Sequence, residues 1–315
     1  MKEQKMAQDN LILKIRTGSH LYGTNTEDSD DDFVGIFLED PEYLLGLSRV
    51  DQVDLSEKSK DDSGRNTRDA KDETIYALRH FMKLAVDNNP NIVELFFANE
   101  ENILFCNDVG RELLALRSAI ISKNVKHRFL GFSHTQKKKM VIKMSNREAI
   151  KQAIEYLKCV EDRYDYVAEI KHHPLFSRNK KEITVADMKI SAGTTCKKAR
   201  KQLEDRVKKF SHREGLVSKY GFDTKFGMHI IRLIQEGITL LECGHLEFPL
   251  PERHILGRIK QGLFTLNDVL DLADGYERDI EKLYLVSKLR HSPDLDTINK
   301  FLIKTYRRTL CAYID

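Results

Sequence analysis

Residues 18–37, GSHLYGTNTEDSDDDFVGIF, hold the side chains whose types and spacing are best suited to chemistry. Gly18-Ser19 follows a short apolar segment, and a turn of this kind brings backbone amides and a hydroxyl close to phosphate oxygens. Asp30 and Asp32 open an apolar strand, in which side chains alternate between faces, so both carboxylates point the same way. The segment therefore predicts a phosphate-binding turn beside paired carboxylates.

Paired carboxylates on one face of a strand are suited to a divalent metal ion. Mg²⁺ prefers hard oxygen ligands and is commonly shared between carboxylates and the phosphates of a substrate. Mn²⁺ accepts the same ligands. Two such ions activate an attacking hydroxyl and stabilise a leaving pyrophosphate. Gly-Ser pairs and Asp-rich loops are each common as simple turns and caps, so only their combination favours a functional interpretation.

The elements that must position these residues are of mixed type over residues 1–105. Apolar alternation predicts strands over residues 11–16 and 32–38 and a weaker strand over 49–55. Residues 56–72 are almost wholly polar and predict an exposed loop. A helix is predicted from Ile75 to Ala85, because apolar residues recur there at spacings of three and four, and it ends before Pro90.

Beyond residue 105, helical periodicity replaces the strand signal. Apolar stripes predict helices around residues 150–160 and 230–241, and a third helix over 278–289. The stretch between the first two, residues 171–213, is polar and basic. We therefore expect an α+β protein, with a mixed sheet and helices in a catalytic domain over 1–105 and a mostly helical substrate- and nucleotide-binding domain over 106–315.

This pattern resembles the nucleotidyltransferase fold of the DNA polymerase β superfamily, whose signature is a Gly-Ser turn followed by Asp-x-Asp on the next strand. More narrowly, it is similar to a group of predicted nucleotidyltransferases of bacteria and their phages. The matching residues are Gly18-Ser19, Tyr22-Gly23, Ser29-Asp30, Asp32 and Gly35-Ile36, followed in order by segments 72–97, 131–136, 220–237 and 257–262. The resemblance thus covers most of the chain, and Asp31 is a departure, since the broader superfamily usually has an apolar residue there.

The resemblance implies a set of site residues. Asp30 and Asp32 would be catalytic and would bind Mg²⁺, or Mn²⁺ in its place, with Asp72 as a third carboxylate on a neighbouring strand. The residues implied to bind the nucleotide are Gly18, Ser19, Tyr22 and Ser29.

On the residues alone, the third carboxylate has several candidates. Asp72 precedes the predicted helix, so it fits a helix N-cap equally well. Glu73, Asp69 and Asp54 are alternative carboxylates.

A second group of candidate residues lies on the predicted helix around residue 230. Lys225, His229 and Arg232 fall within about 60° of one another at 100° per residue. The apolar stripe lies on the opposite side, so the three cations predict either a solvated helix face or a surface for a triphosphate or a nucleic-acid backbone. The resemblance favours nucleotide binding, because this segment is among its matches.

Composition excludes several other classes of protein. The chain has 315 residues, of which 41% are hydrophobic and 32% charged, so it can bury a core. Its five cysteines form no CxxC pair, which argues against a zinc ribbon and a secreted disulfide scaffold. No apolar run approaches the roughly 18 residues of a membrane helix, and the N-terminus lacks a hydrophobic signal segment. We therefore expect a cytoplasmic protein without a membrane partner.

The sequence favours transfer of a nucleoside monophosphate from an NTP to an acceptor hydroxyl, with release of pyrophosphate. An RNA end is slightly favoured as acceptor, because residues 171–213 and 137–139 are basic; a protein or a small molecule stays open. The alternative is a non-catalytic nucleic-acid-binding or toxin–antitoxin-type module on the same scaffold. A phosphohydrolase is disfavoured, since His-Asp clusters are missing from the sequence. The sequence specifies neither the base of the NTP nor the oligomeric state.

Overall fold

The computed structural model divides the chain into two compact units. Unit 1 comprises Met1–His134 and Met228–Asp315, and unit 2 comprises Thr135–Gly227, so unit 2 is inserted within unit 1. The structure describes residues 2–27, 29–57, 71–170, 173–179 and 181–314, without the side chains of 139–144, 208–216, 218 and 312–314.

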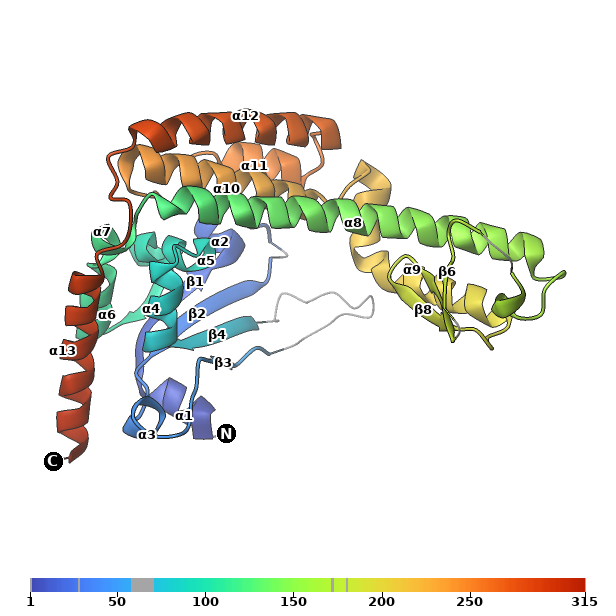
Figure 1. Ribbon diagram of the computed structural model, residues 1–315. Helices are drawn as coiled ribbons and strands as arrows, with labels where there is room; N and C mark the ends of the chain where they lie inside the picture. The colour runs from blue at the N-terminus through green and yellow to red at the C-terminus, as the bar shows by residue number, and fades with distance from the viewer. Residues whose placement is uncertain (1, 28, 58–70, 171–172, 180, 315) are drawn as a thin grey trace. The chain divides into compact units, whose positions relative to one another are not determined.

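A five-stranded mixed sheet lies at the centre of unit 1 (Figure 1). Its strands are β1 (Leu11–Thr17), β2 (Asp31–Phe37), β3 (Gln52–Asp54), β4 (Lys71–Ala77) and β5 (Ile103–Cys106), in the order β3-β4-β2-β1-β5. β2 runs parallel to β4, and the other neighbours are antiparallel. The strands predicted over 11–16, 32–38 and 49–55 are confirmed, the last as a shorter element.

Short helices precede, connect and follow the strands of the sheet. They are α1 (Lys2–Asp9), α2 (Gly18–Tyr22), α3 (Pro41–Leu44), α4 (Leu78–Val86), α5 (Pro90–Val93), α6 (Asp108–Leu114) and α7 (Arg117–Ile120), with single 3₁₀ turns at Glu94–Phe97 and Glu100–Asn102. α1 and α3 pack on the sheet through a cluster that includes Met6, Tyr43, Phe37 and Ile75. The helix predicted from Ile75 is wrong in its first turn, because residues 71–77 pair with β2 and only Leu78 begins α4.

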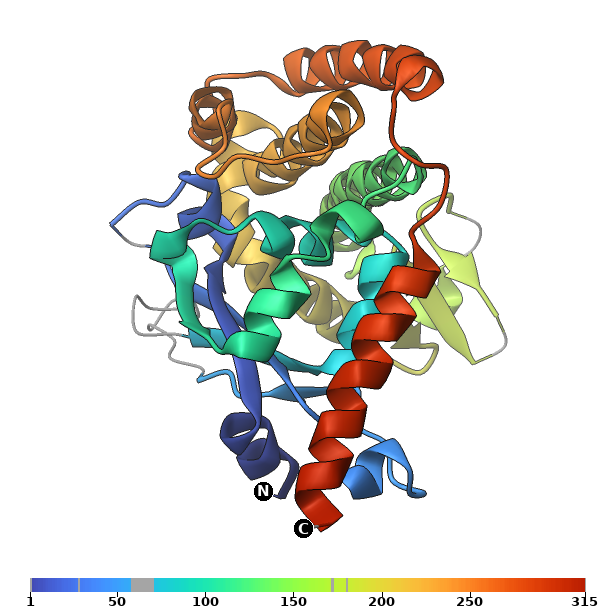
Figure 2. The ribbon, with the colours of Figure 1, turned by 90° about the vertical axis from the view of Figure 1, so that its left-hand side faces the viewer.

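Longer helices complete unit 1. α10 (Thr224–Cys243) is followed by α11 (Arg253–Lys260), α12 (Leu266–Val286) and α13 (Leu295–Ile314). α12 begins earlier than the helix predicted over 278–289, since Thr265 and Asp268 form a capping box at its start. α13 packs on α6 and α7 (Figure 2). Its Lys304 and Arg308 pair with Glu112 of α6.

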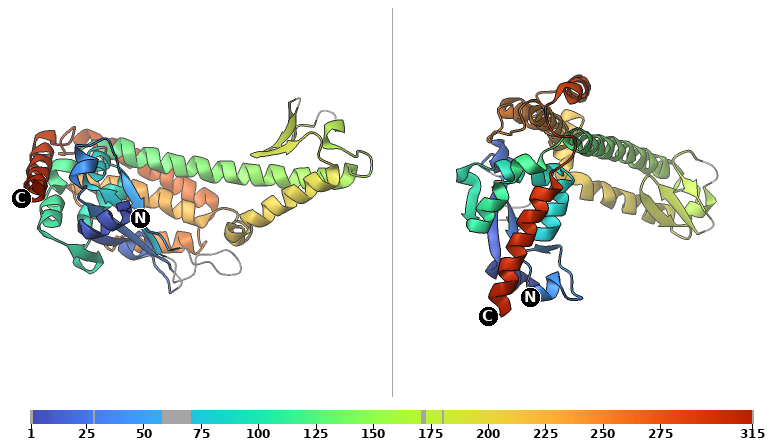
Figure 3. Two further views of the ribbon diagram at one scale, coloured as in Figure 1. Left: turned by 90° about the horizontal axis from the view of Figure 1, so that it is seen from below. Right: turned by 60° about the vertical axis from the view of Figure 1, so that its left-hand side comes forward.

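Unit 2 has a core of its own. The later part of α8 (Asn124–Val160) and α9 (Cys196–Tyr220) pack against a three-stranded sheet of β6 (Ser177–Arg178), β7 (Glu182–Val185) and β8 (Met188–Ser191) (Figure 3). A 3₁₀ turn, Val167–Glu169, also contributes to the core. These strands contradict the expectation that strands end near residue 105; Ile183, Val185 and Ile190 alternate with polar residues, but the strands are too short to stand out in the sequence.

The expected α+β class, with a mixed sheet followed by a mostly helical region, is confirmed. The functional boundary predicted at residue 105 stays a prediction, and the compact units divide the chain elsewhere because α10–α13 return to unit 1. Within the described part of the chain, the structure has no helix both long enough and apolar enough to cross a bilayer.

Candidate metal and nucleotide site

Three carboxylates from two neighbouring strands converge in unit 1. In the parallel register of β2 and β4, Asp32 lies beside Asp72, and Asp30 precedes Asp32 by two residues. One carboxylate oxygen of each lies within 4.8 Å of one oxygen of the other two. Asp30 and Asp32 are half-buried, whereas Asp72 is exposed. The structure thus brings together the carboxylates that were predicted as metal ligands.

The position of Asp72 distinguishes it from the alternatives. It lies within a strand rather than at a helix start, so the N-cap interpretation is wrong. Glu73, the next residue, points to the opposite face and pairs with Lys14 at 2.6 Å. Asp54 lies on β3, where its Oδ1 accepts a hydrogen bond from the backbone N–H of Ser56 at 2.9 Å. Asp69 lies outside the described residues.

The Gly18-Ser19 turn lies directly against this group. Gly18 has a φ of +65°, and a Cβ atom at this position would lie 2.0 Å from Oδ2 of Asp32. Any side chain here would therefore displace the carboxylate, so the turn needs glycine both for its conformation and for the close approach. Ser19 follows in the first turn of α2 and is half-buried. The predicted phosphate-binding turn and the predicted metal ligands are thus adjacent.

Ser29 lies in the loop that joins α2 to β2. Its Oγ accepts a hydrogen bond from the backbone N–H of Thr26 at 2.9 Å, and its own N–H donates to the Thr26 carbonyl at 3.0 Å. These two bonds close a turn immediately before Asp30. Ser29 therefore shapes the approach to the carboxylates, and its contact with a nucleotide stays a prediction.

Asp31 points away from the three carboxylates, as strand alternation requires. Its Oδ1 accepts a hydrogen bond from Nε of Arg16 at 2.7 Å. The same oxygen lies 3.4 Å from Nε2 of His20. Burial, followed by the charge of Arg16, lowers the pKa of His20, so its imidazole is neutral near pH 7. The acidic residue at position 31, where the superfamily usually has an apolar one, thus contacts Arg16 and His20.

A hollow of about 810 Å³ opens beside Asp31, and the basic residues that line it are not predicted from the sequence. Arg16, His20 and Lys71 line it together with Ser29 and Asp31. Arg16 and Lys71 come from the end of β1 and the start of β4, the strand ends next to Asp32 and Asp72. The one sequence signal that could have identified Arg16 and Lys71 is their position at the ends of strands.

The donor set of the carboxylate group fits Mg²⁺ or Mn²⁺. All three side chains offer hard oxygen atoms, and their partial exposure leaves room for water and phosphate oxygens to complete an octahedral shell. Without a cation the three negative charges repel one another. Asp30, Asp32 and Asp72 are therefore the residues of this chain that would hold such an ion.

A buried ionic network joins α2 to α10. Nη1 of Arg232 is 2.6 Å from Glu94 and 2.9 Å from Glu236, and its guanidinium stacks 4.2 Å from the ring centre of Tyr22. The Tyr22 hydroxyl donates to Glu94 at 2.8 Å. Arg232 is only 4% exposed. The exposed cationic stripe expected from helical spacing is therefore wrong at this residue.

Tyr22 is also buried, so both residues tie α2 to α10 within unit 1. These buried contacts favour a structural role for Tyr22 and Arg232, and their predicted contact with a nucleotide stays a prediction.

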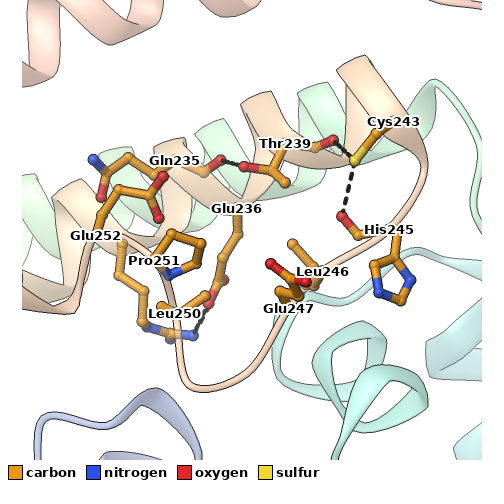
Figure 4. Close-up of a pocket in the computed structure, with 11 residues that line it drawn as sticks. Gln235, Glu236, Thr239, Cys243, His245, Leu246, Glu247, Leu250, Pro251 and Glu252 are labelled. Atoms are coloured by element: carbon orange, nitrogen blue, oxygen red, sulfur yellow. Dashed lines mark hydrogen bonds and ion pairs between the residues drawn. The ribbon is translucent and has the colours of Figure 1, made fainter.

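The network holds two carboxylates against one guanidinium. Burial raises the pKa of Glu236 to about 8, an effect that Arg232 opposes and Glu94 reinforces. At neutral pH Glu236 is therefore protonated, and Glu94 and Arg232 form the ion pair. A cavity of about 330 Å³ lies beside the network, between α10 and the segment that follows it, and Glu236 extends from the helix toward Leu250 (Figure 4).

The other two predicted cations differ in position. Lys225 is exposed and belongs to unit 2, whereas His229 is half-buried and belongs to unit 1. Both lie on α10, and their role in nucleotide binding stays a prediction.

Comparisons with known proteins give one matching family model and two similar proteins. A family model described as "RNA repair pathway DNA polymerase beta family" matches residues 1–304. An uncharacterized 38.9 kDa protein of Enterobacteria phage T4, from the nrdC-mobD intergenic region, is 24% identical and aligns over 96% of this chain and 98% of its own length. A nucleotidyltransferase-like protein from Exiguobacterium sibiricum matches 98% of this chain and 78% of its own, at 9% identity and a TM-score of 0.27.

Proposed function

Because the chain belongs to the RNA repair pathway DNA polymerase beta family, we propose that it is a metal-dependent nucleotidyltransferase that acts on RNA. The observation that carries the proposal is the convergence of Asp30, Asp32 and Asp72 beside the Gly18 turn. In this reaction the acceptor hydroxyl attacks the α-phosphorus of an NTP. The bond between the α-phosphorus and the bridging oxygen breaks, and pyrophosphate leaves.

The position of each site residue indicates its role in the reaction. The backbone of Gly18 and the hydroxyl of Ser19 would hold the β- and γ-phosphates at the start of α2. Asp30 and Asp32 would hold divalent cations, which supply charge neutralisation when bound. Asp72, the exposed member, would take the proton of the acceptor hydroxyl.

Other residues have supporting roles. Ser29 orders the loop before Asp30, while Tyr22 and Arg232 hold α2 against α10. His229 and Lys225 would contact the nucleotide or the acceptor.

RNA is the acceptor that the family description favours, in agreement with the basic stretches of the sequence. A non-catalytic nucleic-acid-binding module would have no need of three converging carboxylates. Their convergence favours the enzyme over that alternative, because a divalent cation offsets their mutual repulsion.

The test is incubation of the pure protein with Mg²⁺, an RNA mixture and each common NTP carrying a label on its α-phosphate. The proposal expects label in RNA with the wild type and none with Asp32→Asn. Asp54→Asn is the matched control, because Asp54 is a carboxylate on a neighbouring strand outside the group. RNA labelled equally by the wild type and Asp32→Asn, or by neither, would refute the proposal.

A further inference from the structure

Charge is strongly segregated between the two compact units. Of the 52 basic and 49 acidic residues in the chain, 23 basic and 12 acidic ones lie in Thr135–Gly227, which gives unit 2 a net charge of +11. The remaining 29 basic and 37 acidic residues give unit 1 a net charge of −8. The near-neutral total of +3 therefore hides a basic unit inserted within an acidic one. Asymmetry of this kind is typical of a unit that meets a polyanion.

Part of this charge gathers at the N-terminal end of α9. Lys197, Lys198 and Lys201 lie within about 100° on the helix, and all three are exposed, whereas Cys196, Ala199 and Leu203 face the core of unit 2. Among the described side chains of α9, the ion pairs are made by Arg200 and Arg206, and the three lysines take part in none of them.

Two of the acidic groups near the start of α9 are already engaged. The carboxylate of Glu161 binds Arg200, and that of Glu169 accepts the backbone N–H of Asp165 at 3.0 Å. The ammonium groups of the three lysines therefore remain available to an anion from outside the chain.

The helix itself does not favour these cations. The first turn of α9 contains no acidic residue, and two of the lysines follow its first residue. Positive side chains at this end oppose the helix macrodipole, and their proximity adds like-charge repulsion. Folding thus gives no reason for three lysines here, whereas an anionic ligand would relieve both effects.

An exposed aromatic residue pairs through its backbone with the residue that caps α9. Tyr166 pairs with Thr195 through a backbone bridge, and Thr195 caps α9 by accepting the N–H of Lys198. Tyr166 is 46% exposed, although the next residue, Val167, belongs to the core of unit 2. Cations beside an exposed aromatic ring are what single-stranded nucleic acid requires, because phosphates pair with the cations and a base stacks on the ring.

We infer that Lys197, Lys198, Lys201 and Tyr166 form a binding surface for single-stranded RNA on unit 2, here called the α9 surface. The lysines neutralise backbone phosphates, and Tyr166 stacks on one base. The inference deepens the proposed function and rests on it for the identity of the polyanion. In this inference unit 2 binds the RNA strand, and unit 1 carries the residues for nucleotidyl transfer.

The test measures binding of a fluorescently labelled single-stranded RNA to the full chain, by anisotropy over a series of salt concentrations and without NTP. The variant Lys197→Gln/Lys198→Gln/Lys201→Gln should bind about tenfold more weakly or worse near physiological salt. Its slope of log affinity against log salt should be shallower by about 2, since each neutralised phosphate contributes about 0.7 on a single strand. The corresponding Lys→Arg variant keeps the charge and should keep both affinity and slope.

Tyr166→Leu separates stacking from charge. Its affinity should fall about fivefold or more with the salt slope unchanged, because a base loses its stacking partner and no phosphate contact is removed. Thermal unfolding of the Lys→Gln variant should show a midpoint equal to or above that of the wild type, which distinguishes lost binding from lost folding.

The matched control removes the same charge from unit 1. Lys288, Lys300 and Arg307 are exposed cations there, and their replacement by Gln should leave RNA affinity within about twofold of the wild type if distant charges are screened. Equal losses in the two triple variants would overturn the inference, as would wild-type binding by the α9 variant. Binding of polyglutamate as tight as that of RNA would also overturn it. A protein that binds RNA through the α9 surface but transfers no nucleotide would refute the proposed function alone.

Discussion

The Cα atom of Gly18 lies so close to Asp32 that a Cβ atom added to it would sit 2.0 Å from the carboxylate oxygen Oδ2. The turn that would hold phosphates and the carboxylate that would hold metal are therefore built as one unit. We predict that Gly18→Ala displaces Asp32 and lowers kcat by at least about 10²-fold, as displaced catalytic groups commonly do. Steady-state kinetics measures the loss.

Gly131→Ala is the control for that substitution. Gly131 lies within α8, and an added Cβ would have no neighbour within 4 Å. Alanine there should stabilise the helix by up to about 1 kcal/mol and leave kcat unchanged. An active Gly18→Ala enzyme would show that the close approach of the turn to Asp32 has no role in the reaction.

Asp72 and Glu73 offer a comparison between neighbours on one strand. Asp72 faces the carboxylate group, whereas Glu73 faces Lys14 on the other side of the sheet. We predict that Asp72→Asn lowers kcat by about 10² to 10⁴-fold, the usual contribution of a general base. Glu73→Gln should cost stability, measured by denaturant unfolding, without a comparable change in kcat. Equal kinetic effects would remove Asp72 from the mechanism.

The buried network predicts an unusual dependence of stability on pH. Burial raises the pKa of Glu236 in the folded protein to about 8, above its ordinary value of 4.5. The unfolded chain therefore releases this proton at a lower pH than the folded chain does. The stability associated with the raised pKa is complete below about pH 4.5 and is lost as the pH rises toward about 8.

Glu236→Gln should remove this contribution, because the amide keeps the shape and cannot ionise. Between about pH 5 and about pH 8, the variant's unfolding free energy should fall by a few kcal/mol less than that of the wild type. Glu242→Gln, an exposed position on the same helix, is the control and should follow the wild type. Parallel pH profiles for the wild type and Glu236→Gln would contradict a protonated Glu236.

A substitution at Tyr22 distinguishes a structural role of this residue from a role in nucleotide binding. Tyr22→Phe keeps the ring beside Arg232 and removes the hydrogen bond to Glu94. If the residue supports α2, unfolding free energy should fall by about 1 to 2 kcal/mol while KM for the NTP stays within about twofold. A large rise in KM with unchanged stability would restore the nucleotide contact that the sequence motif predicts.

Much of the site was readable because its members are close in the chain. Gly18, Ser19, Asp30 and Asp32 lie within one strand–turn–strand unit, where periodicity fixes which side chains share a face. Asp72 stayed ambiguous, because its place depends on a parallel pairing of β4 with β2 that no local pattern specifies. The same pairing turned the start of a predicted helix into a strand.

The rest of the site depended on tertiary contacts. Arg232 reads as a surface cation from helical spacing, yet Glu94 and Glu236 allow it to be buried. Arg16, His20 and Lys71 come together only through the sheet register. The division into units was equally hidden, since α10 to α13 belong to the same compact unit as a sheet that precedes them by more than a hundred residues.

The central claim is that the carboxylate group supports nucleotidyl transfer, and parallel reactions with NTP labelled at the α- or the γ-phosphate test it most directly. With Mg²⁺ and RNA, the account predicts that α-label enters RNA, that γ-label leaves as pyrophosphate, and that Asp32→Asn and removal of the metal by a chelator each abolish both. Entry of γ-label into RNA, or α-label transfer that survives Asp32→Asn, would contradict it.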